Sequence, residues 1–225
     1  MNIALIIAGG SGQRMGQDIP KQFINVYDKP IIVYTMEAFQ RHPEIDAIWV
    51  VCLEGWRDVV KAYARQFGIT KLENIVPGGE RGQDSIRNGL KDIATRHLGA
   101  EDIVLIHDGA RPYIKPEVID EMTAVCESCG AVIAGMPVKD TIKIADPEGF
   151  VASTTDRALT WQIQTPQCFV YSQIMEAYEK ILPFADRMMI TDDAMVYEAA
   201  FPDKKIKLYK AGYENIKITT PDDLR

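Results

Sequence analysis

Short apolar runs rich in β-branched residues alternate along this chain with longer segments of helical spacing, and this alternation constrains the fold more than any other feature. The first run, Ile3 to Ala8, is apolar throughout, as expected for a strand that is covered on both faces. Strands that alternate with helices of about 10 to 15 residues indicate right-handed βαβ crossovers and a mostly parallel sheet. We therefore predict an α/β fold. Further strands are predicted at 47–53, 74–76, 103–106 and 131–135, and helices at 30–39, 56–67, 84–97 and 116–129.

The alternation stops after Pro137. Residues 138–165 contain runs of Val, Ile and Thr with no helical period, and Asp146 to Gly149 has a turn sequence. We interpret this segment as a β-arm inserted into a single domain that spans residues 1–225. A two-stranded hairpin is only marginally stable by itself, so we expect the arm to pack on a partner chain and to form a homodimer. Helices at 172–181 and 192–200 and a strand at 205–209 complete the predicted order.

The charge balance of the chain argues against polyanionic partners. With 25 Lys and Arg against 32 Asp and Glu, the formal net charge is −7, so we expect neither nucleic acid nor a membrane surface as a partner. No run approaches the roughly 18 apolar residues of a membrane-spanning helix, and the first residues lack the basic region and cleavage site of a secretion signal. The four cysteines are too few for a disulfide scaffold at this length. We therefore expect a cytoplasmic protein.

A run of small residues, Ala8 to Gly12, directly follows the first predicted strand. This run is not a Walker P-loop, because no Gly-Lys-Ser/Thr closes it, and it is a poor match to the dinucleotide fingerprint. Small residues let backbone N–H groups approach an anion closely, and Arg14 and Lys21 add two cations that would suit a triphosphate. A tight strand-to-helix turn with basic residues on its surface explains this segment equally well when it is taken alone.

Two further polar loops follow predicted strands. Residues 77–82 open a helix with Ser85 in its first turn, and residues 107–112 (His-Asp-Gly-Ala-Arg-Pro) place Asp108 at a strand end. Asp108 would suit Mg²⁺ or a sugar hydroxyl, although it could instead cap a turn and pair with Arg111. Because the carboxyl ends of parallel strands converge on one crevice, three such loops in succession favour a ligand site there.

Six motifs, which include the first and the third of these loops, occur together in one known family. In chain order they are residues 5–15, Pro20-Lys-Gln-Phe, residues 107–112, Pro137-Val-Lys-Asp-Thr-Ile-Lys, Thr165-Pro-Gln and Asn215-Ile-Lys-Ile-Thr. Over essentially its whole length, the chain resembles the cytidylyltransferases that form CDP-alditols. The arm motif and Thr191-Asp-Asp-Ala-Met favour the branch that uses 2-C-methyl-D-erythritol 4-phosphate in non-mevalonate isoprenoid synthesis. The branch that uses D-ribitol 5-phosphate for teichoic acid or capsule synthesis shares many of these motifs and stays open as an alternative.

The resemblance implies a Rossmann-like nucleotidyltransferase core with a protruding arm, CTP as a substrate, Mg²⁺ as a cofactor and a homodimer that exchanges arms. The implied reaction transfers a cytidylyl group from CTP to the alditol phosphate and releases pyrophosphate. Because a phosphate nucleophile is already ionised at pH 7, we assign no general base to any of the three histidines. Positioning and charge neutralisation are expected to supply the catalysis.

The resemblance assigns three groups of residues. The catalytic cations are Arg14, Lys21 and Lys217. The residues on the acceptor side are Arg111, Thr141, Arg157 and Thr165, with Arg157 reaching the site from an exchanged arm. The residues that hold the nucleotide are Ala8, Gly9, Gly10, Ser11, Gly12, Gly79, Ser85 and Asp108, of which Asp108 also binds the metal.

One position departs from the family pattern. Gly109 stands where the family often has Ala, which we expect to leave room near the sugar. A domain of this fold that binds a nucleotide without catalysis is the alternative from a different class, since a fold does not fix a function. A dehydrogenase is a weaker alternative.

Overall fold

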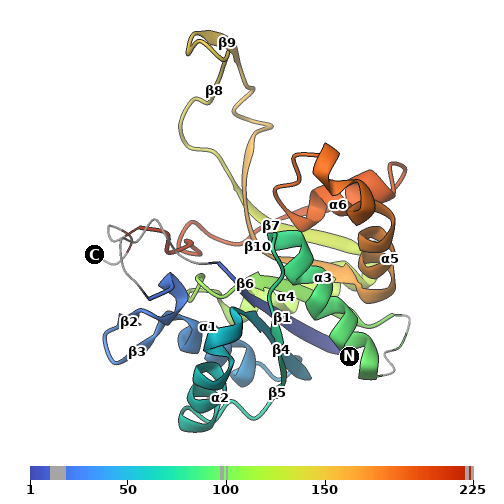
Figure 1. Ribbon diagram of the computed structural model, residues 1–225. Coiled ribbons are helices and arrows are strands. Elements are labelled where there is room, and N and C mark those ends of the chain that lie inside the picture. The colour runs from blue at the N-terminus through green and yellow to red at the C-terminus, as the bar shows by residue number, and fades with distance from the viewer. Residues whose placement is uncertain (11–18, 97–98, 100, 221–222, 224–225) are drawn as a thin grey trace.

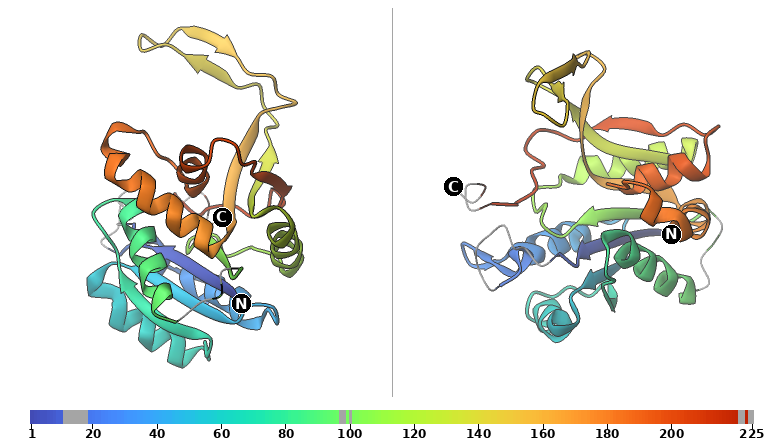
Figure 2. Two further views of the ribbon diagram at one scale, coloured as in Figure 1. Left: turned by 90° about the vertical axis from the view of Figure 1, so that its right-hand side faces the viewer. Right: turned by 45° about the horizontal axis from the view of Figure 1, so that its top comes forward.

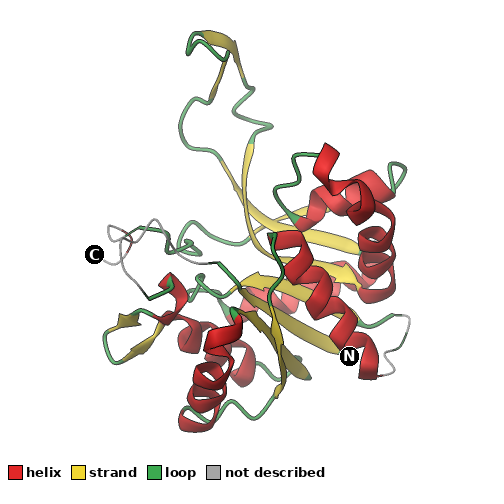
Figure 3. Cartoon of the chain, in the orientation of Figure 1, coloured by secondary structure: helices red, strands yellow, loops and turns green. Residues whose placement is uncertain are grey.

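The computed structural model describes residues 1–10, 19–96, 99, 101–220 and 223. The chain forms a central seven-stranded sheet with helices on both faces (Figure 3). The strands of the whole chain, of which β2–β3 and β8–β9 form two separate small sheets, are β1 (Asn2–Ala8), β2 (Asn25–Val26), β3 (Lys29–Pro30), β4 (Ala47–Cys52), β5 (Leu72–Pro77), β6 (Ile103–Asp108), β7 (Ala131–Pro137), β8 (Lys143–Ala145), β9 (Val151–Thr154), β10 (Trp161–Val170) and β11 (Lys207–Lys210). Its α-helices are α1 (Ile31–Arg41), α2 (Arg57–Gln66), α3 (Gly82–Ile93), α4 (Pro116–Cys129), α5 (Tyr171–Ile181) and α6 (Asp193–Ala200), and its 3-10 turns are η2 (Lys21–Phe23), η3 (Glu54–Trp56), η4 (Ala94–Arg96) and η5 (Leu182–Arg187).

The order of the strands across the sheet is β11-β7-β10-β6-β1-β4-β5. β1 pairs in parallel with β4 and β6, β4 with β5, and β7 with β11, whereas β10 runs antiparallel to β6 and β7. The predicted α/β fold with a mostly parallel, Rossmann-like sheet is therefore confirmed. From β1 the chain builds outward through β4 and β5, and it then returns to the other side of β1 with β6. The topological switch point thus lies between β1 and β6, which is where open α/β sheets bind ligands.

The sequence of β1 explains how the sheet is buried on both faces. Ala4 and Ile6 belong to the core that includes α1, α2 and α4, while Ile3 and Leu5 belong to the core that includes α3, α5 and α6. All four residues are inaccessible to solvent. Because successive side chains of a strand point to opposite faces, a strand between two helical layers must be apolar throughout.

The bounds of most predicted elements agree with the structure to within a few residues. The helix predicted at 116–129 has those bounds, and it ends because Gly130 adopts a left-handed conformation with φ of +84°. The helix predicted at 84–97 ends earlier. Its α-helical part stops at Ile93, where the Ala94 N–H bonds to two carbonyl groups and η4 begins. Among the described residues, no helix has the length and apolar character needed to cross a membrane.

The arm continues a long antiparallel pair of strands out of the sheet. β7 and β10 pair as far as Pro137 and Trp161, and the chain beyond them forms the β8–β9 hairpin, which stands away from the body (Figures 1 and 2). Residues 161–165 belong to β10 in the sheet, so the part that stands off is shorter than the 138–165 interval expected from the sequence. Phe150 and Leu159 in this region are 68% and 79% exposed.

Candidate active site

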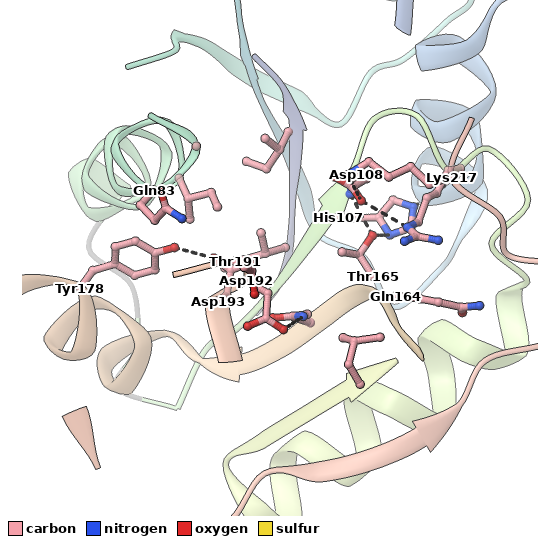
Figure 4. Close-up of a pocket in the computed structure, with 17 residues that line it drawn as sticks. Gln83, His107, Asp108, Gln164, Thr165, Tyr178, Thr191, Asp192, Asp193 and Lys217 are labelled. Atoms are coloured by element: carbon pink, nitrogen blue, oxygen red, sulfur yellow. Dashed lines mark hydrogen bonds and ion pairs between the residues drawn. The ribbon is translucent and has the colours of Figure 1, made fainter. Parts of the chain in front are cut away.

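A cavity of about 410 Å³ lies at the switch point, beside the ends of β1 and β6 (Figure 4). Four of the residues assigned from the sequence line it together: Asp108, Arg111, Thr165 and Lys217. Asp108 ends β6 and Arg111 lies in the loop after it, whereas Lys217 comes from the C-terminal segment. Thr165 reaches the wall at a bulge in β10, where the pairing with β7 shifts register between Ile163 and Gln167.

Asp108 is the centre of a charge cluster at one end of the cavity. Lys217 Nζ lies 3.0 Å from Asp108 Oδ1 and 2.9 Å from Oδ2, and Arg111 Nε lies 3.2 Å from Oδ2. Burial opposes the ionisation of Asp108, but the charges of Lys217 and Arg111 outweigh this effect and lower its pKa below the ordinary value. Two cations against one carboxylate leave a local excess of positive charge, which favours the binding of anions.

Asn215 holds the C-terminal segment of the site in place. Its main-chain carbonyl accepts a hydrogen bond from Arg111 Nη1 at 2.7 Å, and its side-chain amide donates to Thr165 O at 2.8 Å and to Gln164 Oε1 at 3.1 Å. Asn215 is itself buried. These bonds fix the main chain two residues before Lys217, which is how the Asn-Ile-Lys motif delivers a lysine to the cavity.

His107 and Thr165 form a chain of hydrogen bonds behind Asp108. The Asp108 N–H donates to Thr165 Oγ1 at 3.0 Å, Thr165 Oγ1 lies 3.1 Å from His107 Nδ1, and His107 Nε2 lies 3.0 Å from Arg111 O. The His107 ring is fully buried. Burial lowers the pKa of His107 to about 4, so the ring is neutral at pH 7.

The opposite end of the cavity is acidic. Thr191, Asp192 and Asp193 line it at the start of α6, and Tyr178 reaches it from α5 (Figure 4). Asp192 caps α6 by accepting a hydrogen bond from Met195 N at 3.0 Å. The Tyr178 hydroxyl donates to Asp193 Oδ1 at 2.5 Å, and burial raises the pKa of Asp193 to about 7.

The two glycine loops meet at Ser85 in α3. Ser85 Oγ accepts a hydrogen bond from the Gly79 N–H at 2.9 Å, and a Cβ on Gly9 would lie 3.3 Å from the same oxygen. A Cβ on Gly79 would lie 2.4 Å from Asp84 Cβ, so this close approach of the loop to the helix requires glycine. The structure therefore brings together Gly9, Gly79 and Ser85, three of the residues assigned to the nucleotide.

Gln22 fixes the described part of the first glycine loop. Its Nε2 donates to Ala8 O at 2.6 Å and to Gly10 O at 3.0 Å, and its side chain is buried. Lys21, the residue before it, begins η2 and does not line the cavity. The remaining residues assigned to this loop and its flank lie outside the described part of the chain: Ser11, Gly12 and Arg14.

Two residues assigned to the acceptor side are not in this cavity. Thr141 and Arg157 lie in the segments that lead to and from the β8–β9 hairpin, and both are exposed. Arg157 Nη1 donates a hydrogen bond to Lys139 O, in the facing segment on the other side of the hairpin, at 3.5 Å. Within one copy of the chain, these two residues are therefore separate from the Asp108 cluster.

The expectation for Gly109 is wrong in its detail. A Cβ at this position would lie 3.2 Å from Ile7 O and 3.4 Å from Ala8 Cβ. It would therefore point at the end of β1, and the absence of a side chain there lets the loop after β6 approach β1 closely instead of enlarging a sugar site.

Six buried polar residues of the site were not assigned from the sequence: Gln22, His107, Gln164, Gln167, Asp193 and Asn215. Gln22 and Asn215 lie within the motifs that carry Lys21 and Lys217, and that position was the available signal. His107 likewise opens the motif that carries Asp108 and Arg111, but a single histidine at the end of an apolar strand also has the pattern of an ordinary core residue.

The described residues offer Mg²⁺ one carboxylate at the cationic end of the cavity, that of Asp108. No group of three or more His, Cys, Asp or Glu side chains in this part of the chain is arranged to hold a metal ion. Mg²⁺ is commonly bound by one or two carboxylates together with substrate phosphates and water. The donor set therefore fits a metal that binds together with a nucleotide.

A Rossmann-like sheet with glycine loops after β1 and β5, and with a cationic cluster at its switch point, is the arrangement expected of an enzyme that transfers nucleotidyl groups. The sequence profile of the 2-C-methyl-D-erythritol 4-phosphate cytidylyltransferase family matches residues 2–225. The chain belongs to this family.

Individual relatives agree with the family match. The chain is 40% identical over 223 residues to the 2-C-methyl-D-erythritol 4-phosphate cytidylyltransferase of Clostridium botulinum (strain 657 / Type Ba4), with 99% of this chain and 94% of the relative covered. It is 41% identical over 225 residues to that of Clostridium acetobutylicum, with 100% and 94% covered. The crystal structure of 4-diphosphocytidyl-2C-methyl-D-erythritol synthase from Anaerococcus prevotii DSM 20548 superposes with a TM-score of 0.84 at 32% identity, covering 100% of this chain and 92% of that one.

The family defines the reaction. The enzyme transfers a cytidylyl group from CTP to 2-C-methyl-D-erythritol 4-phosphate and releases pyrophosphate, a step of non-mevalonate isoprenoid synthesis. The resemblance read from the sequence is confirmed, and the methylerythritol branch is selected over the ribitol branch. A nucleotide-binding domain without catalysis is excluded by the same match.

Proposed function

We propose that the cavity at the β1–β6 switch point is where this cytidylyltransferase joins its two substrates. The observation that carries the proposal is the convergence of Asp108, Arg111, Thr165 and Lys217 on one cavity from three separate segments of the chain. A dianionic acceptor phosphate must approach an anionic triphosphate here, so the main barrier is electrostatic. The positive excess around Asp108 opposes that repulsion.

The chemical step needs no general base. An oxygen of the acceptor phosphate forms a bond to the α-phosphorus of CTP, the bond from that phosphorus to the oxygen bridging to the β-phosphate breaks, and the electron pair leaves with pyrophosphate. Lys217 is suited to stabilise this charge because its side chain is 39% exposed and faces the cavity while it is held by Asp108. Arg111 is held more rigidly, by Asp108 and by the Asn215 carbonyl, and is suited to orient an anion.

The glycine loops are proposed to hold CTP. Gln22 binds the carbonyl groups of Ala8 and Gly10, and Ser85 sits between the two loops. Both contacts favour a fixed main-chain cradle for phosphate and base. The proposed nucleotide contacts also include Ser11 and Gly12, and Arg14 and Lys21 remain the proposed cations of this side of the site.

Mg²⁺ is proposed to bind at Asp108 together with the triphosphate. When bound, the ion supplies charge neutralisation of the phosphate oxygens. Lys217 and Arg111 already hold the Asp108 carboxylate ionised, as the lowered pKa of Asp108 indicates. The carboxylate is thus kept in the state that a hard cation requires.

The arm is proposed to form a homodimer and to carry Thr141 and Arg157 to the site of a second copy. Support comes from Ile144, Phe150 and Leu159, which are large apolar side chains exposed on a segment with no core of its own. The proposal also places the enzyme in the cytoplasm, because its four cysteines are free thiols, as suits a reducing compartment.

The test measures release of pyrophosphate from CTP with 2-C-methyl-D-erythritol 4-phosphate and Mg²⁺. We expect Lys217→Ala to lower turnover on the order of 10³-fold, by analogy with other cations of phosphoryl transfer, and to melt close to the wild-type temperature. Lys210→Ala, which removes an exposed lysine of β11, is the matched control and should keep full activity. Near-normal turnover in Lys217→Ala would place the reaction elsewhere.

A further inference from the structure

We infer that His107 is a positioning residue for the transfer reaction, acting through the Thr165 hydroxyl. This role rests on the proposed placement of the acceptor at Thr165. His107 is among the residues around the cavity, but its side chain is fully buried and is not exposed to a substrate. Its effect must therefore pass through a hydrogen-bond partner, and the partner whose side chain it orients is Thr165.

The groups at the two ends of this chain of hydrogen bonds, the Arg111 carbonyl and the Asp108 N–H, fix the direction of each bond. The Arg111 carbonyl can only accept, so the neutral ring carries its proton on Nε2 and donates at 3.0 Å. Nδ1 is then an acceptor, and the Thr165 hydroxyl 3.1 Å away donates to it. The Asp108 N–H can only donate, and it does so to Thr165 Oγ1 at 3.0 Å. Every proton in the chain from Asp108 to Arg111 is thereby assigned.

This assignment decides what Thr165 can offer to a substrate. Its proton is committed to His107 and one of its two lone pairs to Asp108 N–H, so a single lone pair remains. Thr165 can thus accept a hydrogen bond from a hydroxyl of the alditol, but it cannot donate to the phosphate. The acceptor phosphate is left to the cations Arg111 and Lys217. His107 accordingly sets which part of the acceptor lies at Thr165.

Two substitutions separate the two hydrogen bonds of His107. The amide introduced by His107→Asn would retain an acceptor near the position of Nδ1, and the longer amide introduced by His107→Gln would retain a donor near the position of Nε2. In His107→Gln the Thr165 proton loses its partner, so the hydroxyl is free to rotate. We expect His107→Gln and Thr165→Val each to lower kcat/KM for the acceptor by about 10- to 100-fold, the effect of one or two lost hydrogen bonds in a buried network. The KM for CTP should change less than about threefold.

His107→Asn and Thr165→Ser are the conservative variants. They keep the acceptor and the hydroxyl, so they should recover kcat/KM for the acceptor to within about fivefold of wild type. The double variant His107→Gln/Thr165→Val should be no worse than the poorer single variant, because both changes remove the same contact. Melting temperatures of all variants identify any that fail to fold.

The possible outcomes are distinguishable. An equal loss of kcat/KM for the acceptor in His107→Asn and His107→Gln would overturn the positioning role and leave His107 a core residue. A loss in the double variant equal to the product of the two single losses would do the same. Unchanged acceptor kinetics in Thr165→Val would instead show that the acceptor is not placed at Thr165, which is a failure of the proposed function. In ¹⁵N spectra of the wild-type enzyme at pH 7, we expect the His107 proton on Nε2, and a proton on Nδ1 would also overturn the assignment.

Discussion

Asp193 makes the stability of this enzyme depend on pH in a way that a single substitution should remove. The carboxyl group is buried at the acidic end of the cavity, where the Tyr178 hydroxyl is its neighbour. Burial raises its pKa in the folded protein to about 7, against about 3.9 in an unfolded chain. Replacing Asp193 with Asn keeps the shape of the side chain and removes its ionisation.

The direction in which the free energy of unfolding changes with pH depends on whether the folded or the unfolded state holds the Asp193 proton. Below about pH 4 the group is protonated whether the chain is folded or unfolded. As the pH rises towards 7, the unfolded chain releases the proton while the folded protein keeps it, so the free energy of unfolding falls. The difference of about three pKa units corresponds to roughly 4 kcal/mol in total, of which about 3 kcal/mol lies between pH 5 and pH 8.

The assay is urea unfolding of wild type and Asp193→Asn at several values between pH 5 and pH 8. The free energy of unfolding of the variant, relative to wild type, should rise by about 3 kcal/mol across this range. A constant offset from the new amide group does not matter, because only the change with pH is compared. Parallel curves for the two proteins would refute the reasoning. Tyr178→Phe removes the hydrogen bond that favours the charged form of Asp193, so the pKa of Asp193 should rise. The pH at which the free energy of unfolding levels off should therefore be higher in this variant.

Four further substitutions, one of them a control, test other parts of the structure. A Cβ on Gly89 of α3 would lie 2.7 Å from Leu5 Cδ1, so Gly89→Ala should lower the free energy of unfolding by about 1 to 2 kcal/mol in chemical denaturation, because overpacking outweighs the gain in helix propensity. Gly55→Ala, where a Cβ would meet nothing within 4 Å, should change it by less than about 0.5 kcal/mol. Gln22→Ala should raise the KM for CTP about tenfold while leaving the KM for the acceptor unchanged, because it releases the first glycine loop. Lys21→Ala should cut pyrophosphate release on the order of 10³-fold with an unchanged melting temperature, and an active variant would remove Lys21 from the proposed machinery.

The parts of the fold that sequence could predict are those governed by local patterns. The bounds of α4 follow from helical spacing and from Gly130, and the burial of β1 follows from its apolar run. The antiparallel insertion of β10 between β6 and β7 was not predicted, because strand order depends on contacts between segments far apart in the chain. The arm was found from a break in periodicity, but its limit at Trp161 depends on pairing with Pro137, which no local pattern records.

The site likewise has residues that the sequence could assign and contacts that it could not. Asp108, Arg111 and Lys217 carry charge and lie in recognisable motifs, so sequence comparison could assign them. The contact between Asp108 and Lys217 joins residues 109 positions apart, and only the folded sheet brings them together. His107 was missed because its importance lies in the directions of two hydrogen bonds, and a sequence does not show what a buried polar group faces.

The strand that forms one wall of the cavity is also the stem of the arm. Successive residues of a strand lie about 3.3 Å apart and point to opposite faces, so deleting one residue between Trp161 and Thr165 would turn the Thr165 side chain away from the cavity. The pair of Pro137 and Trp161 is the last one that joins the arm to the sheet. Gly149 lies beyond this pair, so an insertion near Gly149 leaves the orientation of Thr165 unchanged. The tip of the arm can therefore change in length without moving Thr165, while the spacing at the base of the arm fixes the face on which Thr165 lies.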